Sequence, residues 1–333
     1  MTYKAPVGDG GQKYLAVTVD VEAMPTIGAA DHVDRLIWGR IAGWDREVGI
    51  GRMMDIADEF GVKFTFFLDV LERNRHGQPI EEAAHEILSR GHDLQLHIHR
   101  EFLPEDFWSR LGYLNPTWGM HQYNDEAARL VVDYAVETFV AMTGRKPLAC
   151  RVGAFRYNRA ILRAIEAQGM RLSYHYYPVT SHREKYPHGP DAGILPVFRW
   201  SNGLIEIPTG CLENPHPRKG LARYAGFARV FGVEEGLAYM EKFFAQGPEH
   251  NVLVMLLHSW SLMSKTDSGL GGELNPGLAD IFRFFIDELP ANVKVVTAPD
   301  LLRLVEIGGL SPAFEMPLAV AGTEELPLWK KPK

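Results

Sequence analysis

Residues 94–101 read LQLHIHRE, a short apolar run that predicts a buried strand and ends in two histidines. Residues two apart on a strand point to the same face, so His97 and His99 could reach one metal ion together. An HxH pair alone is a weak signal. Acids or histidines also end two other apolar stretches, VTVDVEA at 17–23 and LLHSW at 256–260. We therefore expect these strand ends to converge on one site.

Strands alternate with helices on both sides of this stretch, which implies parallel βαβ units. The sequence predicts an α/β fold, and a (β/α) barrel of seven or eight strands is favoured because the connections are short. An open doubly wound sheet is the alternative, although no GxGxxG follows the first strand to support a dinucleotide site. In either fold, function belongs at the carboxyl ends of the strands. The expected strands are Tyr14–Asp20, Lys63–Asp69, Leu94–His99, Leu148–Val152, Arg171–His175, Leu204–Pro208, Asn251–His258 and Val293–Thr297, and the expected helices are Arg46–Phe60, Pro79–Ser89, Asp125–Met142, Asn158–Gln168, Val233–Gln246, Pro276–Leu289 and Pro299–Val305.

One domain, residues 14–308, carries this alternation. A flexible leader at 1–13 precedes it, and an extended, Pro-rich tail at 309–333 follows it. Two loop insertions interrupt the pattern. The first, 102–123, is rich in aromatic residues, and the second, 176–233, is rich in Pro, Gly and His.

Composition limits the classes of function. With 333 residues, 46% hydrophobic and 23% charged, the chain can bury a large core. The formal charge of −7 gives no basic surplus for nucleic acid. Only Cys150 and Cys211 are present, so we expect two buried free thiols and a reducing compartment. The first residues lack an apolar signal region and no run is long enough for a membrane span, which predicts a cytoplasmic location; the oligomeric state is not predicted.

Several candidate metal ligands lie at two strand ends. Asp20 and Glu22 have i, i+2 spacing, and two carboxylates in one cavity need a cation or a shared proton to coexist. His97 and His99 offer imidazole, the commonest nitrogen ligand for zinc and similar ions. One acid and two histidines leave coordination positions for water, as a catalytic metal site requires. Glu101 is a rival ligand if the chain turns helical there.

Two further strand ends carry charged or titratable groups. Arg151 ends the fourth strand and would hold a carboxylate in place. Gly153, shortly after it, would let backbone N–H groups approach a substrate closely. His258 ends a strongly apolar strand and could protonate a leaving group near neutral pH. The alternative for each is a structural role, as a surface arginine, a plain turn or a satisfied buried histidine.

Five segments taken together resemble the NodB-type polysaccharide deacetylases, carbohydrate esterase family 4, in their order and spacing. They are VTVDVEA, KFTFFLD, GHDLQLHIH, CRVGAFRYN and VMLLHSW, and the similarity covers Tyr14 to Val305. The HxH form of the histidine motif looks like the branch associated with surface-polysaccharide and O-antigen gene clusters. The ordered set is much more specific than any one of its parts.

The resemblance implies a distorted (β/α) barrel that binds a divalent metal, usually zinc. Asp20 matches the catalytic base of the family, and Arg151 matches the residue that holds this base. His258 matches the catalytic acid, and His97 matches the first metal-binding histidine.

Two positions depart from the usual motifs. Val21 follows Asp20 where the family has a second aspartate, so the resemblance gives the ligand role to Glu22. The second histidine of the family lies four residues after the first, where this chain has Glu101, so His99 or Glu101 must substitute.

These assignments predict a metal-dependent hydrolase that removes an N-acetyl or other N-acyl group from an amino sugar of a polysaccharide or its precursor. The aromatic side chains Phe155, Trp108, Trp118 and Trp260 are expected to contact the substrate. One alternative is a carbohydrate-binding protein on the same scaffold, in which the altered ligands mark lost chemistry. Another is a metal amidase that acts on a non-sugar C–N bond.

Overall fold

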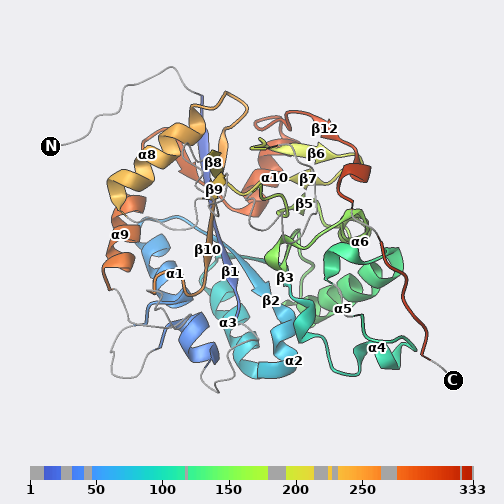
Figure 1. Ribbon diagram of the computed structural model, residues 1–333. Coiled ribbons are helices and arrows are strands. Elements are labelled where there is room, and N and C mark those ends of the chain that lie inside the picture. The colour runs from blue at the N-terminus through green and yellow to red at the C-terminus, as the bar shows by residue number, and fades with distance from the viewer. Residues whose placement is uncertain are drawn as a thin grey trace, which may run out of the picture.

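Strand β1 (Lys13–Val21) lies in the interior of a ten-stranded sheet and is buried along almost its whole length (Figure 1). It pairs in parallel with β10 (Val252–His258) on one side, and with β11 (Val293–Val295) and β2 (Thr65–Asp69) on the other. The computed structural model describes residues 11–23, 32–40, 47–116, 119–178, 193–213, 224–226, 232–263, 276–322 and 325–331.

The sheet has the order β10-β1-β2-β3-β4-β5-β7-β6-β12, with β11 off this path. From β10 to β7 every pairing is parallel, whereas β6 runs antiparallel to β7. An α/β fold with a curled, mainly parallel sheet is thus confirmed, but the expected count of seven or eight barrel strands is not. The remaining strands are β3 (Asp93–Ile98), β4 (Ala149–Val152), β5 (Leu172–Ser173), β6 (Phe198–Trp200), β7 (Ile205–Glu206) and β12 (Glu315–Met316), with β8 (Cys211–Glu213) and β9 (Tyr224–Gly226) in a separate antiparallel pair.

Helices follow the strands, as the alternation predicted. The longest, α5, begins at the Asn124 cap, whose side chain accepts the Ala127 N–H at 2.9 Å, and ends at Gly144 in the left-handed conformation. Its buried stripe packs against the sheet and against α6. The helices are α1 (Ile50–Glu59), α2 (Arg73–His76), α3 (Gln78–Ser89), α4 (Phe107–Arg110), α5 (Asp125–Thr143), α6 (Arg159–Ala167), α8 (Val233–Phe244), α9 (Pro276–Asp287) and α10 (Ala298–Glu306).

The two faces of the central strands belong to different environments. On β1, Leu15, Val17 and Val19 pack into the large apolar cluster that includes α1, α3, α5 and α6. Tyr14 and Ala16 point the other way, into a second cluster that includes residues of α10. Side chains alternate along a strand, so Thr18 and Asp20 share this second face, which we call the inner face. The inner face is apolar at the start of β1 and polar at its carboxyl end.

The curled sheet comes back toward itself between β7 and β10. After β7, the Ile207 N–H still bonds to Ser173 O at 2.8 Å, and the Gly210 N–H then reaches Val254 O of β10 at 3.0 Å. A Cβ at Gly210 would lie 2.8 Å from Val254 O and would overlap the Leu253 side chain. Glycine is therefore needed for this close approach.

The two insertions and the tail contain more structure than the sequence predicted. The segment 102–123 includes α4 and the 3₁₀ turn Met120–Gln122, and the tail pairs with it through isolated bridges between Tyr113 and Lys330 and between Tyr123 and Leu326. The tail also supplies β12, which pairs with β6. The leader, apart from residues 11–13, lies outside the described residues.

Cys150 and Cys211 are both free and buried, which confirms the expectation of two buried thiols. Among the helices of the described segments, none combines the length and the apolar character that a membrane crossing requires.

Candidate active site

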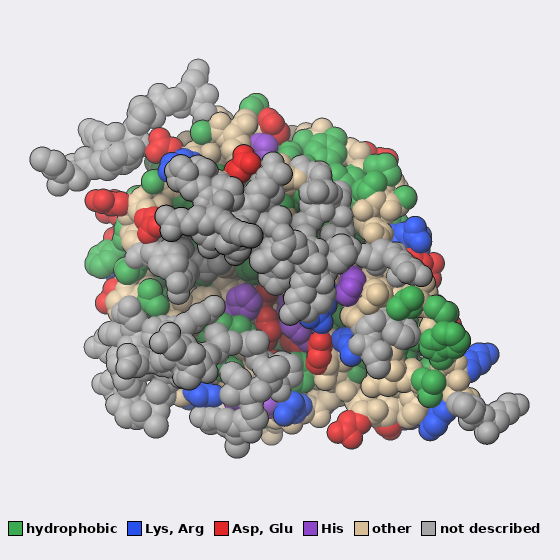
Figure 2. Space-filling model, in the orientation of Figure 1, with side chains coloured by type: hydrophobic (Ala, Val, Ile, Leu, Met, Phe, Trp, Pro, Cys, Tyr) green, Lys and Arg blue, Asp and Glu red, His purple; other side chains and the backbone are tan. Residues whose placement is uncertain are grey.

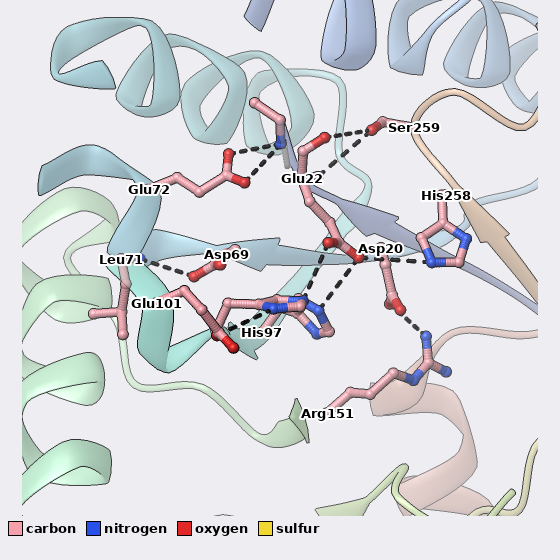
Figure 3. Close-up of polar contacts among 12 residues, drawn as sticks. Asp20, Glu22, Asp69, Leu71, Glu72, His97, Glu101, Arg151, His258 and Ser259 are labelled. Carbon is pink, nitrogen blue, oxygen red and sulfur yellow. Dashed lines mark hydrogen bonds and ion pairs between the residues drawn. The ribbon is translucent and has the colours of Figure 1, made fainter. Parts of the chain in front are cut away.

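Asp20 and Glu22 lie at the carboxyl end of β1, and both side chains are buried. The strand register places Asp20 beside His258 of β10. Charged and histidine side chains are visible together in the centre of the face shown in Figure 2. Figure 3 shows that these two acids are directed toward residues from β3, β4 and β10. The end of β1 is therefore the centre of the polar part of the inner face.

Arg151 of β4 is fully buried and is held by several partners at once (Figure 3). Its Nη1 bonds to Asp20 Oδ1 at 2.6 Å, its Nη2 bonds to Thr18 Oγ1 at 3.0 Å, and its Nε donates to Tyr174 O at 3.3 Å. The guanidinium also lies over the Phe67 ring, 4.4 Å from its centroid. A charge-assisted bond in such a rigid setting fixes the direction of the Asp20 carboxylate.

The Glu22 carboxylate lies among three histidines. Its Oε2 is 3.1 Å from His99 Nε2, and its Oε1 is 3.6 Å from both His97 Nε2 and His258 Nε2. His97 and His99 come from β3 and the residue after it, with ring centroids 5.0 Å apart. The i, i+2 spacing therefore does bring both imidazoles to the same carboxylate.

The ionisation of Glu22 and His99 is coupled. Burial alone would raise the pKa of Glu22, but the neighbouring His99 and His97 hold it well below its ordinary value. Burial would lower the pKa of His99, but Glu22 and Glu101 raise it well above the ordinary value. The carboxylate and a protonated imidazole thus stabilise each other, and a bound cation would take the place of the proton.

The donor set around Glu22 fits a metal ion. Ligand atoms of Glu22, His97 and His99 lie within 4.8 Å of one another, as do those of Asp20, Glu22 and His258. In the second group Asp20 is already bound to a guanidinium. In the first, neither ring nitrogen of the buried His97 has a hydrogen bond within the described part of the chain, which is costly unless an ion is bound. One carboxylate and two imidazoles suit zinc and similar ions.

Glu101 approaches His99 from the side opposite Glu22. Its Oε2 is 3.7 Å from His99 Nδ1, and its Oε1 is 3.4 Å from Arg156 Nη1. Burial would raise the pKa of Glu101, but His99 lowers it to about 2. An acid on the second ring nitrogen of a metal-binding histidine orients the ring and selects its tautomer. Of the two rivals for the ligand role, His99 is the one directed at Glu22.

Gly153 lies directly under the His99 ring. A Cβ there would be 2.5 Å from His99 Nδ1 and closer still to Cε1 and Nε2. Gly153 was expected to let backbone N–H groups approach a substrate closely, and the group that lies against it in the structure is the His99 imidazole. Ala154 and Phe155 follow with φ of 51° and 53°. This left-handed conformation is rare for residues other than glycine, and strained residues of this kind often occur at functional sites.

The four aromatic candidates differ in their placement. Phe155 packs on Tyr177 with centroids 4.8 Å apart, and it follows two residues after Gly153, which lies against the His99 ring. Trp260 stacks on His258 at 4.8 Å and is otherwise packed in a small apolar cluster. Trp108 is buried in the main core, so its ring has no exposed face for a sugar. Trp118 lies outside the described residues.

Two further acids, Asp69 and Glu72, are buried near the site, and the sequence motifs assigned no role to either. Asp69 ends β2 opposite His97, and burial raises its pKa to about 7. Asp69 is the last residue of KFTFFLD, and its position at a strand end is the same signal that singled out Asp20. Glu72 follows in a 3₁₀ turn (Val70–Glu72), and burial together with Asp69 raises its pKa well above the ordinary value. Nothing in the local pattern marks Glu72.

A separate cavity of about 670 Å³ lies away from these residues, lined by parts of α1, α3 and α9 and by Trp38. Its arginines are already matched by acids: Arg40 bonds to Glu47, and Arg90 bonds to Asp55. This cavity is therefore not part of the candidate site.

No protein-family model matches the chain, and no curated protein matches it by sequence. Solved structures do share its fold. A crystal structure from Mycobacterium smegmatis assigned as a polysaccharide deacetylase has a TM-score of 0.55 and 19% identity over 93% of this chain and 96% of that chain. Puue allantoinase has a TM-score of 0.50 and 15% identity over 92% and 94%. A 4-alpha-glucanotransferase from Thermococcus litoralis has a TM-score of 0.56 and 12% identity over 94% of this chain and 42% of that chain.

The names of these three proteins describe different reactions on one fold, so the fold does not decide the reaction. The chain has the fold of a polysaccharide deacetylase, in agreement with the resemblance found in its motifs. The association with the HxH branch and with O-antigen clusters stays a prediction.

Proposed function

We propose that the protein is a metal-dependent hydrolase that removes an N-acetyl or other N-acyl group from an amino sugar of a polysaccharide or its precursor. The observation that carries the proposal is the buried Glu22 carboxylate facing His97 and His99, beside the Asp20–Arg151 ion pair. This arrangement joins a metal-binding donor set to a separate, fixed carboxylate, the two parts that metal-assisted hydrolysis of an amide by water uses.

Glu22, His97 and His99 would hold the ion, most often zinc for such donors. When bound, a divalent ion lowers the pKa of water and polarises a carbonyl group. Glu101 would orient His99 through Nδ1.

Asp20 is the proposed general base, and it takes a proton from the attacking water. Arg151 keeps the carboxylate directed at the site through the 2.6 Å bond. His258 is the proposed general acid: its side chain is partly exposed, its ring is fixed by stacking on Trp260, and it donates a proton to the departing amine. The products are a carboxylic acid and the free amine.

The left-handed turn after β4 offers backbone donors for the oxyanion. We assign this role to the N–H of Ala154 or Phe155, because their strained conformation changes the direction of the chain next to His99. Phe155 and Trp260 lie near the same rim and would contact the sugar. A nucleotide-linked or lipid-linked precursor in the cytoplasm is the proposed source of that sugar.

The test measures metal content and deacetylation together. We expect the purified protein to bind close to one zinc per chain, to lose it in His97→Ala, and to release acetate from at least one member of a panel of N-acetylated amino sugars. Zinc binding without release from any sugar, but with hydrolysis of linear or cyclic amides, would assign the site to a non-sugar amidase. Absence of metal binding at micromolar supply, with sugar binding retained, would make it a carbohydrate-binding protein.

A further inference from the structure

Glu22 lies just beyond the end of regular strand pairing. β1 pairs with β10 up to Asp20 and with β2 up to Val21. The backbone groups of residues 22 and 23 therefore have no ladder partner, although they are buried and need hydrogen bonds. Side chains from two other elements supply these bonds (Figure 3).

Glu72 supplies the first set. Both of its carboxylate oxygens accept the Ala23 N–H, at 2.7 and 2.8 Å, from the 3₁₀ turn that follows β2. The side chain is completely buried, and a buried acid is retained only where it has a specific partner. Since the Ala23 N–H occupies its oxygens, Glu72 is placed to fix the chain next to Glu22 rather than to bind an ion itself.

Ser259 supplies the second set from the other side. Its Oγ donates to Glu22 O at 3.1 Å and lies 3.5 Å from Glu22 N, while its own N–H donates to Asp20 O at 2.9 Å. Ser259 follows β10 directly and is also completely buried. One short side chain thus links the proposed base, the proposed metal ligand and the strand that carries His258.

We propose that Glu72 and Ser259 are positioning residues that hold Glu22 in the geometry for metal binding. The proposal rests on the proposed function. It adds two residues to which the motifs assign no role: Glu72 lies outside every motif, and Ser259 lies within LLHSW beside His258. Together the two side chains hydrogen-bond to the backbone of residues 22 and 23, where strand pairing has ended. Glu72 does so from the turn after β2, and Ser259 does so from the residue after β10. Loss of the hydrogen bonds from either side chain lets the Glu22 carboxylate move away from His97 and His99.

The test measures metal affinity independently of turnover. Cobalt(II) is titrated into the metal-free protein, and the dissociation constant and the visible ligand-field spectrum are recorded for wild type and for Glu72→Ala, Glu72→Gln and Ser259→Ala. Glu72→Ala should bind about 10–100-fold more weakly, the usual effect of removing a partner behind a ligand. Glu72→Gln, which keeps one acceptor oxygen, should recover part of this loss. Ser259→Ala should bind roughly 3–10-fold more weakly, the equivalent of one hydrogen bond.

Asp93→Asn is the matched control, because Asp93 is a buried acid at the opposite end of β3 and bonds to Thr65 and Gln95. It should keep the wild-type cobalt affinity and spectrum. Wild-type affinity in both Glu72→Ala and Ser259→Ala would overturn the inference, and an equal loss in Asp93→Asn would reduce it to general destabilisation. If Glu72→Ala does not fold, Glu72→Gln and Ser259→Ala decide the result. A wild-type protein that binds neither cobalt nor zinc overturns the proposed function itself, and this inference with it.

Discussion

Gly153→Ala should weaken metal binding strongly while leaving the fold intact. Gly153 does not have a positive φ, so alanine fits the backbone there. The obstacle is the His99 ring, which occupies the position of the new side chain. This single methyl group therefore tests whether His99 is a ligand.

The size of the effect follows from the distances. The added Cβ would lie 2.5 Å from His99 Nδ1, against an ordinary separation of about 3.5–4.0 Å, so the ring must move by roughly 1 Å or more. Metal–nitrogen bonds to zinc are about 2.0–2.1 Å, with a tolerance of about 0.2 Å. A ring displaced that far cannot keep its bond. We expect affinity for zinc and turnover each to fall at least about 100-fold.

Zinc affinity by competition with a chromophoric chelator, acetate release, and thermal unfolding of the metal-free protein check the prediction. Gly232→Ala is the control, because a Cβ at Gly232 meets nothing within 4 Å and its φ of −160° suits alanine. Metal-free Gly153→Ala should unfold within a few degrees of this control. Wild-type zinc affinity in Gly153→Ala would refute the reasoning and would return the ligand role to Glu101.

Three further outcomes follow. Asp20→Asn should lower kcat by about 10²–10⁴-fold, as expected for a general base, and should lower the free energy of unfolding by about 1–3 kcal/mol because Arg151 loses its charged partner; wild-type turnover would remove Asp20 from the mechanism. Burial raises the pKa of Asp93 to about 6, so this carboxyl loses its proton at a lower pH in the unfolded chain than in the folded protein. Its contribution to the free energy of unfolding is therefore fully present below pH 4 and falls by roughly 3 kcal/mol as the pH rises to 6. Denaturant titrations should show that loss in wild type but not in Asp93→Asn. Burial also raises the pKa of the Cys150 and Cys211 thiols, so DTNB should react with neither in the native protein and with both in denaturant, and rapid native reaction would contradict their placement.

Alternation along the strands made much of the site readable from the sequence. The i, i+2 spacing of His97 and His99, and of Asp20 and Glu22, gave the face that these side chains share, because side-chain direction on a strand depends only on local geometry. The same rule applied to KFTFFLD would have added Asp69. Residue-level roles stay proposals, since shared placement does not establish what a side chain does.

The remaining features depend on contacts that no local pattern encodes. Glu72 meets Ala23 across 49 residues of sequence, and the space above Gly153 is filled by a histidine from another strand. The strands β6, β8 and β12 have only two or three residues, too few to show a period of two, and the segments that hold them looked like loops. Trp108 was expected to contact the substrate, but its side chain packs in the main core. An aromatic residue in an insertion can equally be part of the core.

The pairing of β1 with β10 has a consequence for folding during synthesis on the ribosome. Ser259 and Glu22 are 237 residues apart in the chain, a separation that takes roughly 12–47 s to synthesise at about 5–20 residues per second. Throughout that interval the first strand lacks the neighbour that completes one of its edges, and its apolar side chains remain available to chaperones or to other nascent chains. The arrangement that places Asp20 beside His258 also makes the candidate site one of the last parts of the molecule to form.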